Sequence, residues 1–229
     1  MSFKLVWERW RELTRFRLAC EMALSSYRKS FLELPVRGIQ DAKIYDERGV
    51  TRFECSYNDF LDVLKDETQL YRLLIVGHTS LIEEFGRVIV TQLLDENLVG
   101  RVAFPGMQLH GTNAEATDHY IRKVNIEAWG SALLNAAKVT WDIVPGGQGA
   151  VVHAVVVRNI VGHGANSYNN TAINRINGVV PGYVTFSGGH SLILDREAFQ
   201  QFLSTLRNFG RIICGVPARV RRNAGERAS

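Results

Sequence analysis

Residues 195–213 read DREAFQQFLSTLRNFGRII, and no other stretch of the chain predicts an amphipathic helix so clearly. Asp195 suits the position just before the helix, where its carboxylate can accept a backbone N–H that has no partner within the helix. Apolar side chains then recur at steps of three and four along one face, namely Phe199, Phe202, Leu203, Leu206, Phe209 and Ile213. This spacing predicts a helix that packs its apolar face against other helices.

The same periodicity predicts further helices at 3–33 and 118–141. Pro35 ends the first, because proline cannot continue a helix. Residues 58–96 predict a short helical piece capped by Asn58 or Asp59, followed by a long helix. The segment AVVHAVVVRNIVGH at 150–163 remains ambiguous: its β-branched residues favour a strand, whereas its length and glycine-rich start favour a buried helix.

The segments between these helices predict loops and small β-hairpins. Residues 39–56 indicate one hairpin, and 164–194 indicate loops with a second hairpin that turns at Gly188–Gly189. Residues 97–117 predict a long loop. We therefore expect a mainly α fold, a bundle of about five helices with small β-hairpin insertions, over residues 1–215 as a single domain, with 216–229 as a basic, disordered tail.

The composition is that of an ordinary globular protein, with 229 residues of which 46% are apolar and 22% charged. This excludes collagen-like, disordered and coiled-coil classes for the bulk of the chain. The three cysteines are widely spaced and odd in number, which favours reduced thiols in a cytoplasm. The charged N-terminus has no apolar signal core and the apolar runs are short, so we expect a cytoplasmic protein without a membrane span.

Positive charge gathers at both ends of the chain, while the middle is acidic. Residues 1–30 carry seven Lys or Arg against three acids, and residues 207–229 carry six Arg against one Glu. Such ends suit non-specific contacts with the phosphates of a nucleic acid, although a solvated helix face and a frayed terminus give the same pattern. The candidate RNA-binding residues are Arg9, Arg11, Arg15, Arg17, Arg219, Arg221 and Arg222.

Several common sites are not expected. The glycine-rich PGGQGAVV at 145–152 lacks the third glycine of a dinucleotide fingerprint and the Lys-Ser or Lys-Thr of a P-loop. His78 is followed by Glu83 and Glu84, which is not the HExxH spacing of a zinc site. We therefore expect no metal and no cofactor.

The segment Arg158-Asn159-Ile160-Val161-Gly162-His163 carries the sharpest chemical hint, because Arg and His interrupt an otherwise apolar run. A buried, unpaired Arg is costly, so we expect both side chains at a polar cleft or an interface. His can transfer a proton near neutral pH, and Arg can hold a phosphate through its planar fork. The two would not share a face of a straight helix, but the glycines at 162 and 164 predict that the helix ends there, so that His163 can turn back.

RNIVGH resembles the motif of the HEPN superfamily, in which an Arg is followed by a polar residue and, a few residues later, by a His. Predicted helices at about 3–33, 68–96, 118–141, 148–162 and 195–213 fit its helical bundle, in which the motif ends a late helix. The resemblance implies a metal-independent endoribonuclease whose composite active site forms in a homodimer. It implies His163 as general acid or base, Arg158 as the ligand of the scissile phosphate and Asn159 as a positioning or phosphate-contacting residue.

The resemblance also implies products with 2′,3′-cyclic phosphate and 5′-hydroxyl ends, and a role as a bacterial toxin or antiviral defence effector restrained by a cognate antitoxin or regulatory protein. Its partners would be RNA and a second copy of the chain. The alternative is a non-catalytic helical module that binds RNA or protein, because a fold is often kept after its catalytic activity has been lost. A small-molecule enzyme that uses the glycine-rich loop is a third, weaker reading.

Overall fold

The computed structural model describes residues 2–32, 43–45 and 54–225, and most of these residues are helical. The α-helices of this part of the chain are α1 (Phe3–Leu32), α2 (Tyr57–Lys65), α3 (Thr68–Asp95), α4 (Asn113–Lys123), α5 (Ile126–Ala136), α6 (Gly147–Gly162), α7 (Asn170–Val179), α8 (Arg196–Cys214) and α9 (Val216–Gly225). Two single 3₁₀ turns, η1 (Arg101–Ala103) and η2 (Trp141–Ile143), lie between them. The predicted mainly α class is confirmed, with more and shorter helices than the five expected.

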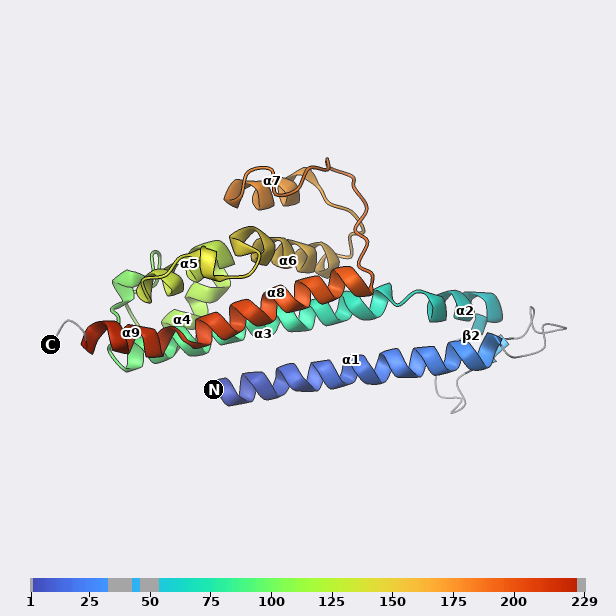
Figure 1. The fold of residues 1–229 in the computed structure, drawn as a ribbon, viewed down its shortest axis with the longest axis horizontal. Coiled ribbons are helices and arrows are strands. Elements are labelled where there is room, and N and C mark those ends of the chain that lie inside the picture. The colour runs from blue at the N-terminus through green and yellow to red at the C-terminus, as the bar shows by residue number, and fades with distance from the viewer. Residues whose placement is uncertain (1, 33–42, 46–53, 226–229) are drawn as a thin grey trace.

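Helix α3 lies at the centre and packs against both α1 and α8 (Figure 1). Helix α1 runs antiparallel to α3, because its start meets the far part of α3 through Trp7 and Phe85, whose rings lie 4.7 Å apart. Helix α8 runs parallel to α3, because Tyr71 stacks on Phe199 at the beginning of both helices with ring centroids 5.0 Å apart. Helices α5, α6 and α7 lie on the other side of the α3–α8 pair from α1 (Figure 1).

The residues that predicted α8 behave as expected. The Asp195 carboxylate accepts the backbone N–H of Ala198 at 2.8 Å, as the predicted N-cap. Most of the apolar stripe is fully buried against α3 and α6, including Phe199, Leu206, Phe209 and Ile213. The predicted amphipathic helix is therefore confirmed, together with its buried face.

The ambiguous segment at 150–163 forms helix α6 rather than a strand. Its Val and Ala side chains are buried between α3, α7 and α8, so packing on several sides outweighs the strand preference of the β-branched residues. The backbone enters the helix through Gly146 with a φ of 82° and Gly147 with a φ of 66°, values that favour glycine.

The prediction of one helix at 118–141 preceded by a long loop is wrong. Thr112 and Glu115 form a capping box that starts α4 inside the expected loop. Helix α4 ends at Lys123, and the extended backbone of its C-cap, Val124, turns the chain before the N-cap of α5, Asn125. The apolar residues of both helices face one core, which gave the impression of a single continuous period.

Residues 164–194 hold a helix that the sequence did not indicate. Asn169 caps α7 by accepting the backbone N–H of Ala172 at 2.8 Å. Instead of the second predicted hairpin, the described residues show a single bridge between Ser167 and Ser191. The first hairpin is supported by the antiparallel pairing of β1 (Lys43–Tyr45) with β2 (Glu54–Ser56), while its turn lies outside the described residues.

The basic end is ordered as far as the structure describes it. Residues 216–225, expected to be a disordered tail, form α9 instead, because Val216, Pro217 and Val220 are buried against the helical core. The expected caps of the short piece after 58 are also corrected. Ser56 caps α2, its hydroxyl accepting the backbone N–H of Asp59 at 3.1 Å.

Candidate functional site

The motif residues lie at the C-terminal end of α6, where the helix stops as predicted. Gly164 has a φ of 70°, and its N–H donates to the carbonyl of Val161 at 2.9 Å. The N–H of Ala165 donates to the carbonyl of Ile160 at 3.0 Å, which completes a Schellman motif. His163 is the C-cap residue, and its side chain is exposed. The imidazole makes no hydrogen bond or ion pair with any described residue, so it is open to a substrate.

Arg158 lies one turn and a half before the cap and is held in place by two partners. Its Nη2 donates to Oε1 of Glu83 on α3 at 2.8 Å, and its Nη1 donates to Oδ1 of Asn159 at 3.0 Å. Its Nε is buried and has no partner among the described residues. The guanidinium is thus largely fixed, and only 27% of its side-chain surface is exposed.

Two hollows flank the motif and share two of their lining residues. One, of about 200 Å³, contains His163, and the other, of about 150 Å³, contains Arg158 and Glu83. Asn159 and Arg175 line both. The structure therefore places Arg158 and His163 in neighbouring hollows on either side of Asn159, rather than in one open cleft of a single chain.

Arg175 on α7 is a residue that the sequence analysis missed. Its Nε and Nη2 donate to the two carboxylate oxygens of Glu127 on α5 at 2.6 and 2.8 Å. This bidentate ion pair holds α7 on α5, next to the motif. The signal was absent from the sequence because α7 was not expected and because the partner lies 48 positions away.

The loop that follows His163 is anchored on α6. Tyr168 is buried, and its hydroxyl lies 2.8 Å from Nε2 of His153. Burial lowers the pKa of His153 to about 4, so this imidazole is neutral at physiological pH. His153 is therefore a structural partner of the loop, whereas His163 is the accessible imidazole.

The seven candidate RNA-binding arginines lie in different surroundings. Arg11 and Arg15 are exposed on α1, and Arg219 and Arg222 are exposed on α9. Two others face carboxylates: Nε of Arg17 lies 3.8 Å from Glu21, and Nε of Arg221 donates to Glu96 at 3.1 Å. Arg9 is exposed on α1. The candidate arginines of α1 and those of α9 therefore lie on different helices, and none of the seven lines the hollows of the motif.

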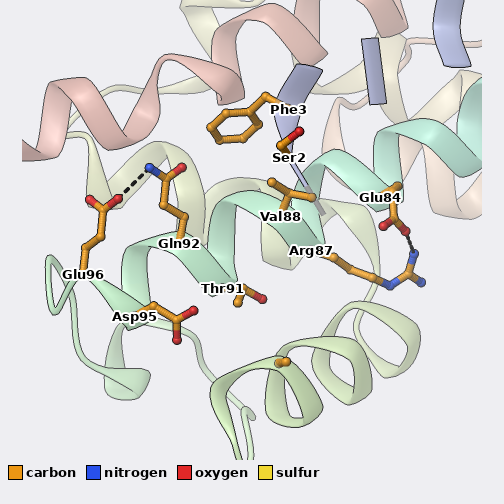
Figure 2. A pocket seen from close by; sticks show the side chains of 10 residues that line it. Ser2, Phe3, Glu84, Arg87, Val88, Thr91, Gln92, Asp95 and Glu96 are labelled. Atoms are coloured by element: carbon orange, nitrogen blue, oxygen red, sulfur yellow. Dashed lines mark hydrogen bonds and ion pairs between the residues drawn. The ribbon is translucent and has the colours of Figure 1, made fainter. Parts of the chain in front are cut away.

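A hollow of about 610 Å³ lies where the start of α1 crosses α3 and α4. Figure 2 shows its carboxylates, among them Glu84, which binds Arg87, and Glu96, which accepts a hydrogen bond from Gln92. Asp95 also lines it. Its carboxylates make this hollow a poor site for a polyanion.

Within the described ranges, no group of three or more His, Cys, Asp or Glu is arranged to hold a metal ion. None of the helices there is long and apolar enough to cross a membrane. Comparisons with protein-family models, with curated proteins and with solved structures each found no significant match. The case for a function therefore depends on the residues and their geometry.

Proposed function

We propose that this protein is a metal-independent endoribonuclease of the HEPN type. The observation that carries the proposal is the Arg158–Asn159–His163 set at the end of α6, where an exposed imidazole caps the helix and a fixed guanidinium lies one turn and a half before it. Cleavage of RNA by its own 2′-hydroxyl requires a group that transfers protons and a permanently charged group that binds the phosphate.

In the proposed reaction, the 2′-hydroxyl of the substrate attacks the neighbouring phosphorus, and the bond to the 5′-oxygen breaks. His163 takes the proton of the attacking hydroxyl or gives one to the leaving oxygen. Arg158 stabilises the extra negative charge on the phosphate, and Asn159 positions the guanidinium through the hydrogen bond at 3.0 Å. The products carry a 2′,3′-cyclic phosphate and a 5′-hydroxyl, and DNA is not cut because it lacks the nucleophile.

The separation of Arg158 and His163 into two hollows supports a composite site. A second copy of the chain, placed with its own motif opposite this one, would offer an Arg and a His to the same phosphate. We therefore propose a homodimer in the cytoplasm that acts as a toxin or antiviral defence effector under the control of an antitoxin or regulatory protein.

One observation favours the alternative of a non-catalytic module that binds RNA or protein. Nη2 of Arg158 already donates to the Glu83 carboxylate, which must share the guanidinium with an incoming phosphate. If replacing the Glu83 carboxylate by a phosphate at Arg158 costs too much free energy, the motif only holds α6 on α3 and has no catalytic role.

The test is cleavage of end-labelled RNA, including tRNA, by the purified full-length chain in EDTA, beside the His163→Ala variant. Cutting by the unmodified chain alone, with cyclic-phosphate ends, supports the nuclease. Equal cutting by both proteins would place the chemistry elsewhere or reveal a contaminant. Light scattering on the same samples measures the oligomeric state, and a monomer that cuts RNA would contradict the composite site.

A further inference from the structure

A second hollow, of nearly the same size as that in Figure 2, lies between α1 and α8. These two helices flank α3 and leave a groove of about 600 Å³ between them. Among the described residues, its lining contains four arginines and no Asp or Glu, and consists of Trp7, Trp10, Arg11, Thr14, Arg15, Arg207, Arg211 and Cys214. We refer to it as the arginine groove.

None of the four arginines of the groove has an acidic partner among the described residues. Arg11, Arg15, Arg207 and Arg211 are all exposed, and the ion pairs and hydrogen bonds of the described residues include none of their guanidinium groups. Arg158, Arg175 and Arg221, by contrast, each bind a carboxylate. Glu8 and Glu12 follow groove residues by one position, about 100° further round α1, and do not line the groove. The described residues therefore leave the positive charge of the groove uncompensated.

The floor of the groove is aromatic and carries no negative charge. Trp7 packs on Phe85 with ring centroids 4.7 Å apart, and Trp10 is 4% exposed. Cys214 accepts a hydrogen bond from the Trp7 side chain, and burial raises the pKa of its thiol to about 11, so that it stays protonated. Trp7 is only partly buried and offers an apolar surface between the two rows of arginines.

We propose that the arginine groove binds the phosphate backbone of a single strand of RNA; the choice of RNA as the polyanion rests on the proposed function. Each helix supplies two arginines four residues apart, which puts neighbouring guanidinium groups about one turn, or about 6 Å, apart along the groove. That regular spacing on two facing rows fits a linear polyanion, whose phosphates accept the planar fork of Arg. The partly exposed indole of Trp7 suits sugars or bases.

The groove acts on affinity rather than on bond cleavage. Helices α3 and α8 lie between α1 and α6 (Figure 1), so the nucleotides bound at Arg11 and Arg207 are not those bound at Arg158 and His163 of the same chain. The groove therefore adds to the affinity of the enzyme for long RNA, beyond the contribution of the few nucleotides that contact the motif. Short oligonucleotides that fill only the motif would gain nothing from it.

The test measures binding without cleavage, in the His163→Ala background, by fluorescence anisotropy of a labelled 20-nucleotide single-stranded RNA over a range of salt concentrations. The groove variant is R11Q/R207Q, and the matched control is K65Q/K138Q, which removes the same charge from exposed positions outside the groove. We expect the groove variant to lose about tenfold in affinity, and the slope of log K against log salt to fall by about 1.4, as for two lost phosphate contacts. The control should stay within about twofold of the parent.

Several outcomes would overturn the groove assignment. Equal losses in the two double variants would show a general effect of net charge. Unchanged binding in the groove variant, with circular dichroism showing a folded chain, would leave the groove without a role. Displacement of the RNA by polyglutamate of equal charge and concentration would point to an acidic protein as the occupant instead.

This result is separable from the proposed nuclease activity. If the unmodified chain cuts no RNA but R11Q/R207Q loses affinity, the proposed function fails and the groove stands. If the unmodified chain cuts RNA and R11Q/R207Q binds and cuts 20-nucleotide RNA as well as its parent, the groove fails and the nuclease stands.

Discussion

Arg158 and Glu83 join α6 to α3 through a charge-assisted hydrogen bond of 2.8 Å, and both side chains are about one-quarter exposed. His163, five residues later, is exposed and makes no comparable contact with the described residues. The two central members of the candidate site therefore differ in what their loss does to the fold. An activity measurement on Arg158 variants is interpretable only beside a stability measurement.

We predict that Arg158→Ala lowers the free energy of unfolding by about 1–3 kcal/mol, because it leaves the Glu83 carboxylate half-buried and unpaired. His163→Ala should change it by no more than about 0.5 kcal/mol, because the side chain is exposed. Urea denaturation measures both. The double variant R158Q/E83Q should cost less than the sum of its two single variants, since no charge is then left alone. A large loss of stability in His163→Ala would show that the imidazole has a structural partner.

Gly130 on α5 is predicted to be required by close packing. A Cβ there would lie 2.8 Å from the ring of Trp141, which is stacked on Phe209 and bound to Ser131. We expect Gly130→Ala to destabilise the protein by about 1–3 kcal/mol, although alanine is the better helix former.

Gly178 on α7 is the matched control, because a Cβ there meets nothing within 4 Å. Gly178→Ala should be neutral or stabilise the protein by up to about 1 kcal/mol. Thermal denaturation of the two variants gives the comparison. A stable Gly130→Ala variant would mean that the Trp141 ring can move aside at little cost.

The buried imidazole of His78 and the partly buried imidazole of His153 predict a loss of stability on mild acidification. Burial lowers the pKa of His78 from 6.5 to about 4, and burial lowers that of His153 to about 4 as well. Between these values the unfolded chain binds protons that the folded chain cannot, so stability is full above about pH 6.5 and falls as the pH drops toward 4. For the fully buried His78 the loss is about 3 kcal/mol.

Urea titrations at several values between pH 7 and pH 4 test this, with His78→Phe as the variant that removes one titrating group. The variant should show a shallower decline with pH, whatever its absolute stability at pH 7. An identical decline in both proteins would assign the pH dependence to other groups.

The sequence predicted the elements whose own residues determine them. Helices α1, α3 and α8 each carry a long apolar stripe with clear ends, and the stop of α6 follows from Gly162 and Gly164. The sequence does not distinguish a helix from a strand at α6, because a segment buried on several sides has no polar face and shows no clear hydrophobic period. Helices α4 and α5 were merged because both bury residues in one core, and the capping box at Thr112 and Glu115 was overlooked.

What the sequence could not predict depends on contacts between distant segments. The pairing of Arg158 with Glu83 spans 75 positions, and nothing near either residue indicates it. Helix α9 is ordered because a few apolar residues, Val216 and Val220 among them, reach a core built by the rest of the chain. Arg207 and Arg211 join Arg11 and Arg15 only because α1 and α8 both flank α3.

The ion pair between Arg175 and Glu127 stabilises the position of α7. Helix α7 buries few side chains, among them Ile173 and Ile176, so its hold on the rest of the molecule depends strongly on this ion pair with α5. Both carboxylate oxygens are bound, and Lys cannot reproduce the planar fork. Arg175→Lys should therefore cost about 1–2 kcal/mol, and a double-mutant cycle with Glu127→Gln should give a coupling energy of about 1–3 kcal/mol.

Hydrogen exchange distinguishes a local from a global effect of this change. In Arg175→Lys the amides of α7 should exchange faster while those of α3 keep their protection, because local opening needs only the few contacts of α7 to break. Uniform acceleration over both helices would contradict a local role. Because Arg175 lines both hollows beside Asn159, a loosened α7 should also weaken RNA cleavage, while binding of long RNA to the arginine groove on the far side of α8 should remain unchanged. Weaker cleavage together with unchanged binding in this one variant would show that the motif and the arginine groove act separately.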